Sequence, residues 1–173
     1  MDNAEITAFW QVARRHARLE KVPVYGGPVP LELLQPAPVQ FGDNPAQSDD
    51  LAELVVAGQK TLTSSAAWDY EAAGEPLPTP GTMNILVDGN DHPRALIVVR
   101  AVDVVPFDQV DEEHARAEGE GDGSLADWRR RHEEFFRSSA EHDRGFSETM
   151  PVVLERFELI YPKAAKAKSR SLV

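Results

Sequence analysis

Two strand-forming segments joined by a short turn restrict the fold of this chain more than any other feature. Residues 94–107 read RALIVVRAVDVVPF, and their many β-branched side chains predict the longest strand. Residues 83–87 predict a shorter strand, and the turn Gly89-Asn90-Asp91 separates the two. We therefore expect an antiparallel hairpin to which the other elements are added.

Two segments before the hairpin predict amphipathic helices. In residues 3–17 the apolar side chains recur every three or four positions, as on one face of a helix. In residues 48–57, Ser48 can accept a hydrogen bond from a first-turn backbone N–H, and the two aspartates that follow suit the positive end of the helix. Gly58 can end this helix without strain.

The remaining segments predict a turn-rich stretch, two helices and a last strand. Residues 66–81, rich in glycine and proline towards their end, are expected to form turns. Residues 111–118 predict a short helix, and residues 124–136 predict a longer helix that Ser124 can cap. The run PVVLERFELIYP, residues 151–162, predicts the final strand.

This order of elements predicts an α+β fold, a small and mostly antiparallel β-barrel with surrounding helices. A length of 173 residues suits one domain. We expect residues 1–40, a helix and a Pro-rich extended segment, to pack on a body formed by residues 41–162. Residues 163–173 carry four basic residues and no acidic ones, which predicts a disordered tail.

The composition excludes several classes of function. The chain contains no cysteine, so disulfides, thiolate catalysis and cysteine-ligated zinc are excluded. A formal net charge of −11 opposes the wrapping of long duplex DNA, so any nucleic acid must meet a local basic pocket. No targeting segment is visible, and no apolar run approaches the roughly 18 residues of a membrane span. We expect a cytoplasmic protein that is not a membrane protein.

The best indication of function lies directly after Gly58. Lys60, Thr61 and Thr63 stand in the run GQKTLTSS, which places an ammonium group beside several hydroxyl groups at the start of an expected strand. Such a cluster suits phosphoryl or carbonyl chemistry.

Several stretches of the chain together resemble the ASCH domain family. They are DDLAELVVAGQKTLT, EPLPTPG, the long strand ending in VPF, EEHARAEGEGDGSLADWRRRHEEFF and the closing FELIYP. The resemblance covers roughly residues 41–162 and implies a barrel similar to the PUA domains that bind RNA, with a cleft for RNA or a nucleotide. Some members of the family cleave single-stranded RNA with the help of a divalent metal ion, and smaller members remove the acyl group from an acetylated cytidine.

The resemblance also implies catalytic residues. The lysine and the second threonine of the motif G-x-K-T-x-T fall on Lys60 and Thr63, and the glutamate of H-A-x-x-E falls on Glu118. The chain departs from the family after Gly81, where Thr82 stands in place of the acid that relatives often carry.

Glu120 and Asp122 follow Glu118 in the alternating run EGEGD. With a substrate phosphate they could hold a Mn²⁺ or Mg²⁺ ion, because such ions keep bound waters and need few protein ligands. Two other interpretations stay open: the run is an acidic surface loop, or one of its carboxylates pairs with Lys60 and sets its protonation.

Six residues are candidates for contacting the substrate through stacking, hydrogen bonds or charge. The spacing of Trp128 and His132 on an apolar helix face equally predicts that both are core residues. The six are Thr61, Tyr70, Arg100, Trp128, Arg129 and His132.

Three functions are therefore considered for an RNA- or nucleotide-binding protein. The first is a hydrolase that cleaves single-stranded RNA, with Lys60 stabilising the developing charge. The second is an amidohydrolase acting on an acylated cytidine, with Lys60 as base and Thr63 as nucleophile. The third is an RNA-binding module without catalytic activity. We expect Lys60, Thr63 and one of Glu118 or Glu120 to converge in one cleft of the barrel.

Overall fold

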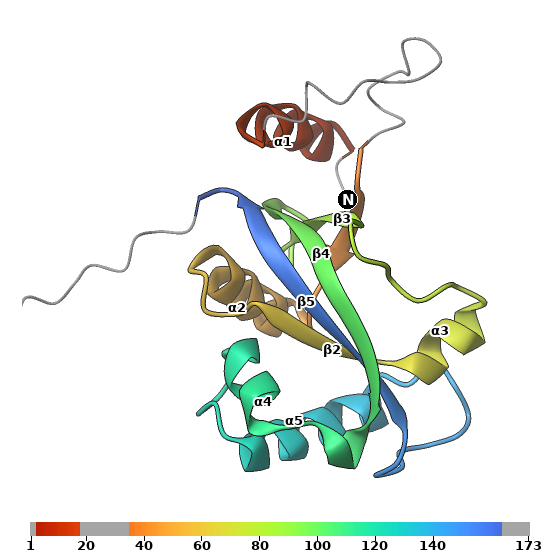
Figure 1. The fold of residues 1–173 in the computed structure, drawn as a ribbon. Coiled ribbons are helices and arrows are strands. Elements are labelled where there is room, and N and C mark those ends of the chain that lie inside the picture. Colours follow the sequence, from red (N-terminus) through yellow and green to blue (C-terminus); the bar gives the residue numbers. More distant parts are fainter. Residues whose placement is uncertain (1–2, 18–34, 164–173) are drawn as a thin grey trace, which may run out of the picture.

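The predicted hairpin lies at the centre of a five-stranded sheet (Figure 1). The computed structural model describes residues 3–17 and 35–163. Strand β3 (Met83–Val87) pairs antiparallel with β4 (Pro93–Pro106), which is the longest strand, so the hairpin prediction is confirmed. Its turn is closed by the Asp88 carboxylate, which accepts from the backbone N–H groups of Asn90 and His92, each at 3.0 Å.

Three more strands complete the sheet in the order β1-β3-β4-β5-β2. Strand β5 (Pro151–Tyr161) runs antiparallel to β4, and β2 (Leu62–Ala66) runs antiparallel to β5. Strand β1 (Ala37–Gln40) pairs with β3 and is parallel to it. The sheet is therefore mostly antiparallel, as the sequence predicts.

The expectation of a closed barrel is wrong, because the sheet curls into an open half-barrel. Strand β3 pairs with residues 93–98 of β4, whereas β2 pairs with residues 152–156 of β5, which lie beside residues 101–105 of β4. The two edges of the sheet are thus at opposite ends of the long strands and do not meet. Within residues 35–163, β1 and β2 each pair with a single neighbour.

Five α-helices surround the sheet within the described residues, together with a short 3₁₀ helix. Figure 1 shows α4 and α5 side by side at one end of the long strands and α1 at the other end. The helices are α1 (Asn3–His16), α2 (Pro45–Val56), α3 (Ala67–Ala73), η3 (Phe107–Gln109), α4 (Glu112–Glu118) and α5 (Leu125–Ser138).

Three apolar clusters hold the helices on the sheet. Helix α1 packs through Ile6 and Trp10 on Ile85, while α2 packs on Leu86. Because neighbouring residues of a strand point to opposite faces, α1 and α2 cover opposite faces of β3. The third cluster joins α4 and α5 to the other end of β5 and includes Phe107, Ala115, Trp128, Phe136 and Val152.

Two local predictions are wrong. Helix α2 begins at Pro45 and not at Ser48, because the Asn44 side chain accepts from the Gln47 backbone N–H at 3.0 Å and a proline suits the first helical position. Ser48 is instead buried inside the helix. The first part of the expected turn-rich stretch forms α3, which ends at Gly74 with a φ of 67°.

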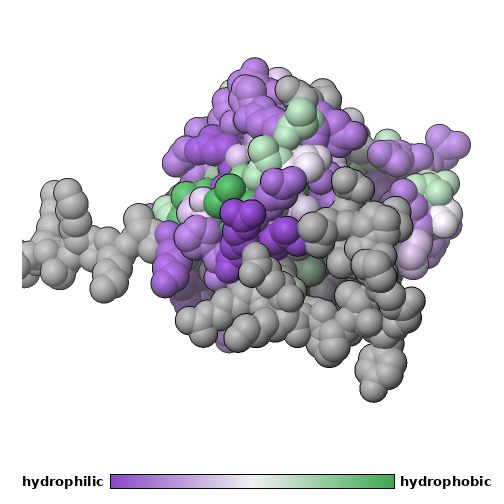
Figure 2. All heavy atoms as spheres, turned by 90° about the horizontal axis from the view of Figure 1, so that it is seen from above, coloured by the Kyte–Doolittle hydropathy of each residue, from purple (hydrophilic) through white to green (hydrophobic). Residues whose placement is uncertain are grey.

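Polar residues dominate the coloured surface in the view from above (Figure 2). In the described part of the chain, no helix combines the length and apolar composition of a membrane span. The expectations for the Pro-rich segment before residue 35 and for the tail after residue 163 fall outside the described residues.

Candidate functional site

A buried carboxylate, Glu118 at the end of α4, is the centre of a polar network inside the protein. Its Oε1 accepts hydrogen bonds from Ser64 Oγ at 2.5 Å and from Trp128 Nε1 at 2.8 Å. His114 Nε2 lies 2.8 Å from the same oxygen and 2.8 Å from Ser64 Oγ. One carboxylate oxygen therefore joins β2, α4 and α5.

The second oxygen of Glu118 meets the buried ammonium group of Lys60. Lys60 Nζ lies 3.0 Å from Glu118 Oε2 and 2.5 Å from Glu120 Oε1, and the residue is only 2% exposed. Arg131 binds the other oxygen of Glu120 at 3.0 Å, and His132 Nε2 lies 3.4 Å from Glu118 Oε2. The lysine thus has two carboxylate partners and no open path to solvent.

The charges of this network stabilise one another. Burial alone would lower the pKa of Lys60, but the negative charges of Glu118 and Glu120 outweigh burial and raise this pKa above its usual 10.5. Burial alone would raise the pKa of Glu118, but the charge of Lys60 and the interaction with His132 hold that pKa well below its usual 4.5. Lys60 is therefore a firmly protonated cation, which does not suit the role of a base.

Local backbone geometry brings the end of α4 against the segment before β2. The Thr61 backbone N–H and Oγ1 donate to the Ala117 carbonyl at 3.0 and 3.2 Å. Gly119 has a φ of 69°, and a Cβ there would lie 2.5 Å from the Gln59 carbonyl oxygen. Only glycine fits this close approach, which places the glutamates on either side of it next to Lys60.

Of the predicted catalytic residues, Lys60 and Glu118 come together with Glu120, but Thr63 does not. Leu62, Ser64 and Ala66 of β2 point towards α4 and α5, so Thr63 points to the opposite face of the sheet. Ser64 takes the place in the network that the resemblance implies for Thr63.

The predicted substrate-contacting residues are dispersed. Trp128 and His132 are buried, with stacked rings whose centroids lie 4.1 Å apart, so they belong to the core and the network. Arg129 donates to the Asp108 carbonyl at 2.9 Å, and the exposed Arg100 pairs with Glu158 at 2.6 Å. Thr61 is engaged with α4, and Tyr70 lies on the Thr63 face of β2.

The two residues considered for a metal ion do not fit one. Both oxygens of Glu120 are taken by cations, Lys60 and Arg131. Asp122 is exposed and accepts from the Ser124 backbone N–H at 2.8 Å. Across residues 3–17 and 35–163, no three His, Asp or Glu side chains are grouped as a metal site. We derive no chemical step through a metal from these residues.

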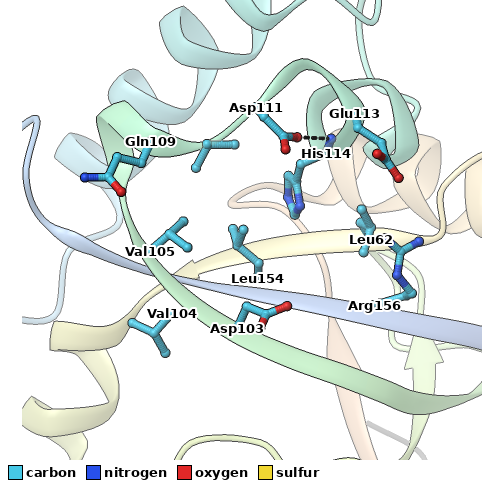
Figure 3. A pocket seen from close by; sticks show the side chains of 11 residues that line it. Leu62, Asp103, Val104, Val105, Gln109, Asp111, Glu113, His114, Leu154 and Arg156 are labelled. Atoms are coloured by element: carbon cyan, nitrogen blue, oxygen red, sulfur yellow. Dashed lines mark hydrogen bonds between the residues drawn. The ribbon is translucent and has the colours of Figure 1, made fainter.

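An open pocket of about 360 Å³ adjoins the network (Figure 3). Its floor is formed by side chains of β2, β4 and β5, and Figure 3 shows Asp111, Glu113 and His114 reaching over it from the start of α4. The lining residues are Leu62, Asp103, Val104, Val105, Gln109, Val110, Asp111, Glu113, His114, Leu154 and Arg156.

His114 connects the pocket to the network, because it lines the pocket while its Nε2 contacts Glu118 and Ser64. Arg156 is the basic residue of the pocket; it is exposed and forms no ion pair with any described residue. Three carboxylates, those of Asp103, Asp111 and Glu113, also line the pocket, so only a short stretch of a polyanion can approach.

His114, Ser64 and Arg156 were not singled out from the sequence, although a signal existed for two of them. His114 is the histidine of the H-A-x-x-E motif and stands four residues before Glu118, so both lie on one face of α4. Ser64 alternates with Leu62 and Ala66, which marks it as inward-facing. For Arg156, only the pairing with Leu62 in the folded sheet shows that it reaches the pocket.

Acid should destabilise the protein partly through Glu118. The folded-state pKa of Glu118 lies below its usual 4.5, so its contribution to stability is complete above that value and is lost as the pH falls towards the folded-state pKa. We expect the free energy of unfolding, measured with urea between pH 6 and pH 3.5, to fall less steeply in Glu118→Gln than in the unaltered protein. If the free energy of unfolding depends on pH equally in the two proteins, Glu118 does not cause this effect.

Comparisons with known proteins agree with this architecture. The model of the ASCH domain family matches residues 37–161. The solved ASCH domain from Lactobacillus crispatus JV V101 is 26% identical, with a TM-score of 0.75 over 91% of this chain and 96% of that one. Protein EF3133 from Enterococcus faecalis V583 is 29% identical, with a TM-score of 0.75 over 91% of each chain. The comparison with curated proteins found no match. The residues that the family model matches include all five strands of the sheet and both Lys60 and Glu118. The chain therefore belongs to the ASCH domain family.

Proposed function

We propose that this ASCH domain binds single-stranded RNA at the pocket beside His114 and cleaves it. The observation that carries the proposal is the position of His114, which lines an open pocket while a buried, ionised carboxylate contacts its Nε2. A carboxylate in this position fixes the orientation of the imidazole, as proton-transfer histidines require.

The pocket suits one nucleotide unit of a flexible strand. Its volume of about 360 Å³ lies in the range of small-molecule sites, and its floor of Leu62, Val105 and Leu154 is apolar. Arg156 is free to donate to the oxygens of a phosphate. Single strands are recognised through such local contacts, whereas a duplex needs a broad basic surface, which a formal net charge of −11 opposes.

In the proposed reaction the described residues move one proton and stabilise one charge. His114 Nδ1, which forms no hydrogen bond with a described residue, accepts the proton of a ribose 2′-hydroxyl. The 2′-oxygen attacks the adjacent phosphorus, the bond from phosphorus to the 5′-oxygen of the next nucleotide breaks, and that oxygen takes a proton from water. The Arg156 guanidinium stabilises the charge that develops on the phosphate. Lys60 never touches the substrate in this scheme; it keeps Glu118 ionised.

The acyl-cytidine alternative receives less support from the same geometry. It needs Thr63 beside Lys60, but Thr63 points to the other face of β2. It also needs Lys60 as a base, and the raised pKa of Lys60 opposes that role. Ser64, the hydroxyl that does reach Glu118, is buried and donates to that carboxylate.

The test is to incubate the protein with a short single-stranded RNA and with the same oligomer carrying one 2′-deoxynucleotide, with and without a chelator, and to identify the products by mass spectrometry. We expect products ending in a 2′,3′-cyclic phosphate, no cleavage after the deoxynucleotide, and no effect of the chelator. Cleavage after the deoxynucleotide would contradict the proposed attack. If the protein binds the RNA but forms no products, it is a non-catalytic RNA-binding module. Acetylated cytidine is tested as a second substrate, and release of its acetyl group would show that the protein is an amidohydrolase.

A further inference from the structure

The face of β2 that points away from His114 carries a second polar cluster, which the proposed cleavage does not use. Thr63 pairs across the sheet with Glu155 of β5, so the two side chains share this face. Tyr70 of α3 bridges the cluster: its hydroxyl lies 3.3 Å from Ser65 Oγ and donates to Glu155 Oε1 at 3.5 Å. All four residues are half-buried, so a ligand can reach them.

Glu155 has more capacity to accept hydrogen bonds than the protein uses. A carboxylate can accept about four, yet Glu155 receives only the long bond from Tyr70 and has no ion pair within residues 3–17 and 35–163. The carboxylate of Asp88 at the hairpin turn, in contrast, accepts from two backbone N–H groups and from Arg94. Burial raises the pKa of Glu155, and no neighbouring cation reverses this effect.

The surroundings of Glu155 suit a flat, partly apolar ligand. Val102 of β4, which is half-buried, pairs with Glu155 on the side opposite to Thr63. The partly buried ring of Tyr70 lies at the other side of the cluster. A planar ring placed here would cover the valine surface and direct its edge at the carboxylate.

We propose that Thr63, Ser65, Tyr70 and Glu155 form a nucleobase subsite selective for guanine. Guanine is the RNA base whose Watson–Crick edge carries two adjacent donors, N1–H and N2–H, and these match the two oxygens of a carboxylate. Adenine would direct its N1 lone pair at the same carboxylate, and uracil and cytosine offer one donor at that edge beside an acceptor. Unstacked bases of single-stranded RNA are read at this edge. The inference rests on the proposed RNA function, since it names the base that would be bound on the other face of the strands that line the cleavage pocket.

The test compares guanosine with inosine, which lacks only the 2-amino group, and with adenosine, by calorimetric or NMR titration at neutral pH. Guanosine should bind about tenfold more tightly than inosine, the effect of one good base contact, and adenosine should bind more weakly than either. Glu155→Gln should weaken guanosine binding about tenfold and abolish the preference over inosine. Glu158→Gln, at an exposed position of the same strand, is the matched control and should preserve both.

Equal affinity for the three nucleosides, or a guanosine preference that survives in Glu155→Gln, would overturn the guanine subsite. Thermal unfolding of Glu155→Gln would verify that the variant is folded, and Tyr70→Phe, which removes only the hydroxyl, should give a smaller loss. Nucleosides carry no phosphate, so this result is independent of RNA cleavage. A guanosine preference without cleavage would refute only the proposed function, and cleavage without a preference would refute only the subsite.

Discussion

Replacing Lys60 with Met should lower the free energy of unfolding by about 3–5 kcal/mol, the usual cost of removing one partner of a buried ion pair. Met fills a similar volume, so the cost arises from charge. Without the ammonium group, Glu118 and Glu120 lie next to each other in the interior, with Arg131 as the remaining cation. Urea unfolding at neutral pH measures the change.

The matched control for Lys60→Met is Arg100→Met. Arg100 also pairs with a glutamate, Glu158, but their side chains are 53% and 55% exposed. Exposed pairs contribute little, so this substitution should change the free energy of unfolding by less than about 1 kcal/mol. A loss in Lys60→Met no larger than in Arg100→Met would show that the buried network does not stabilise the fold.

His114→Asn should reduce the rate of RNA cleavage by about 10²–10⁴-fold, the range attributed to general acid–base catalysis. The amide of Asn cannot accept and release a proton at neutral pH. Binding of RNA should change much less than the rate, because Arg156 and the apolar floor remain. Single-turnover rates and equilibrium binding, measured on the same oligomer, separate the two effects.

A control histidine is available at the hairpin turn. His92 is exposed, pairs with Glu5 at 2.8 Å and directly precedes β4, whereas the pocket residues 103–105 lie near the other end of that strand. His92→Asn should cleave RNA at the unaltered rate. Full activity in His114→Asn would remove this residue from the mechanism, and an equal loss in both variants would point to a general effect of the substitutions.

The motifs in the sequence predicted the centre of the site better than its details. Lys60 and Glu118 are 58 positions apart, and the expectation that they meet agrees with their 3.0 Å contact. The face of the sheet to which Thr63 points depends on the alternation of side chains along β2. The run Leu62-Thr63-Ser64 offers hydroxyls on both faces, and the alternation of Ser64 with the apolar Leu62 and Ala66, which the motif does not include, indicates that Ser64 points inward.

A local signal explains one of the other differences. Asn44-Pro45 is a better helix start than Ser48, since asparagine caps well and proline suits the next position. Closure of the barrel, in contrast, depends on where each short strand pairs along β4 and β5, which the sequence of any one strand does not contain. The position of Arg156 in the pocket likewise depends on the pairing of β2 with β5.

The most direct test of the account is to locate the bound RNA. A single-stranded oligouridine with 2′-O-methyl groups cannot undergo the proposed attack and contains no guanine, so it probes the pocket alone. In an NMR titration with this oligomer, we predict that the largest shifts occur at the backbone amides of Asp103, Gln109, His114 and Arg156. Shifts confined to other parts of the protein, with these four amides unchanged, would contradict the assignment of the pocket as the RNA-binding site.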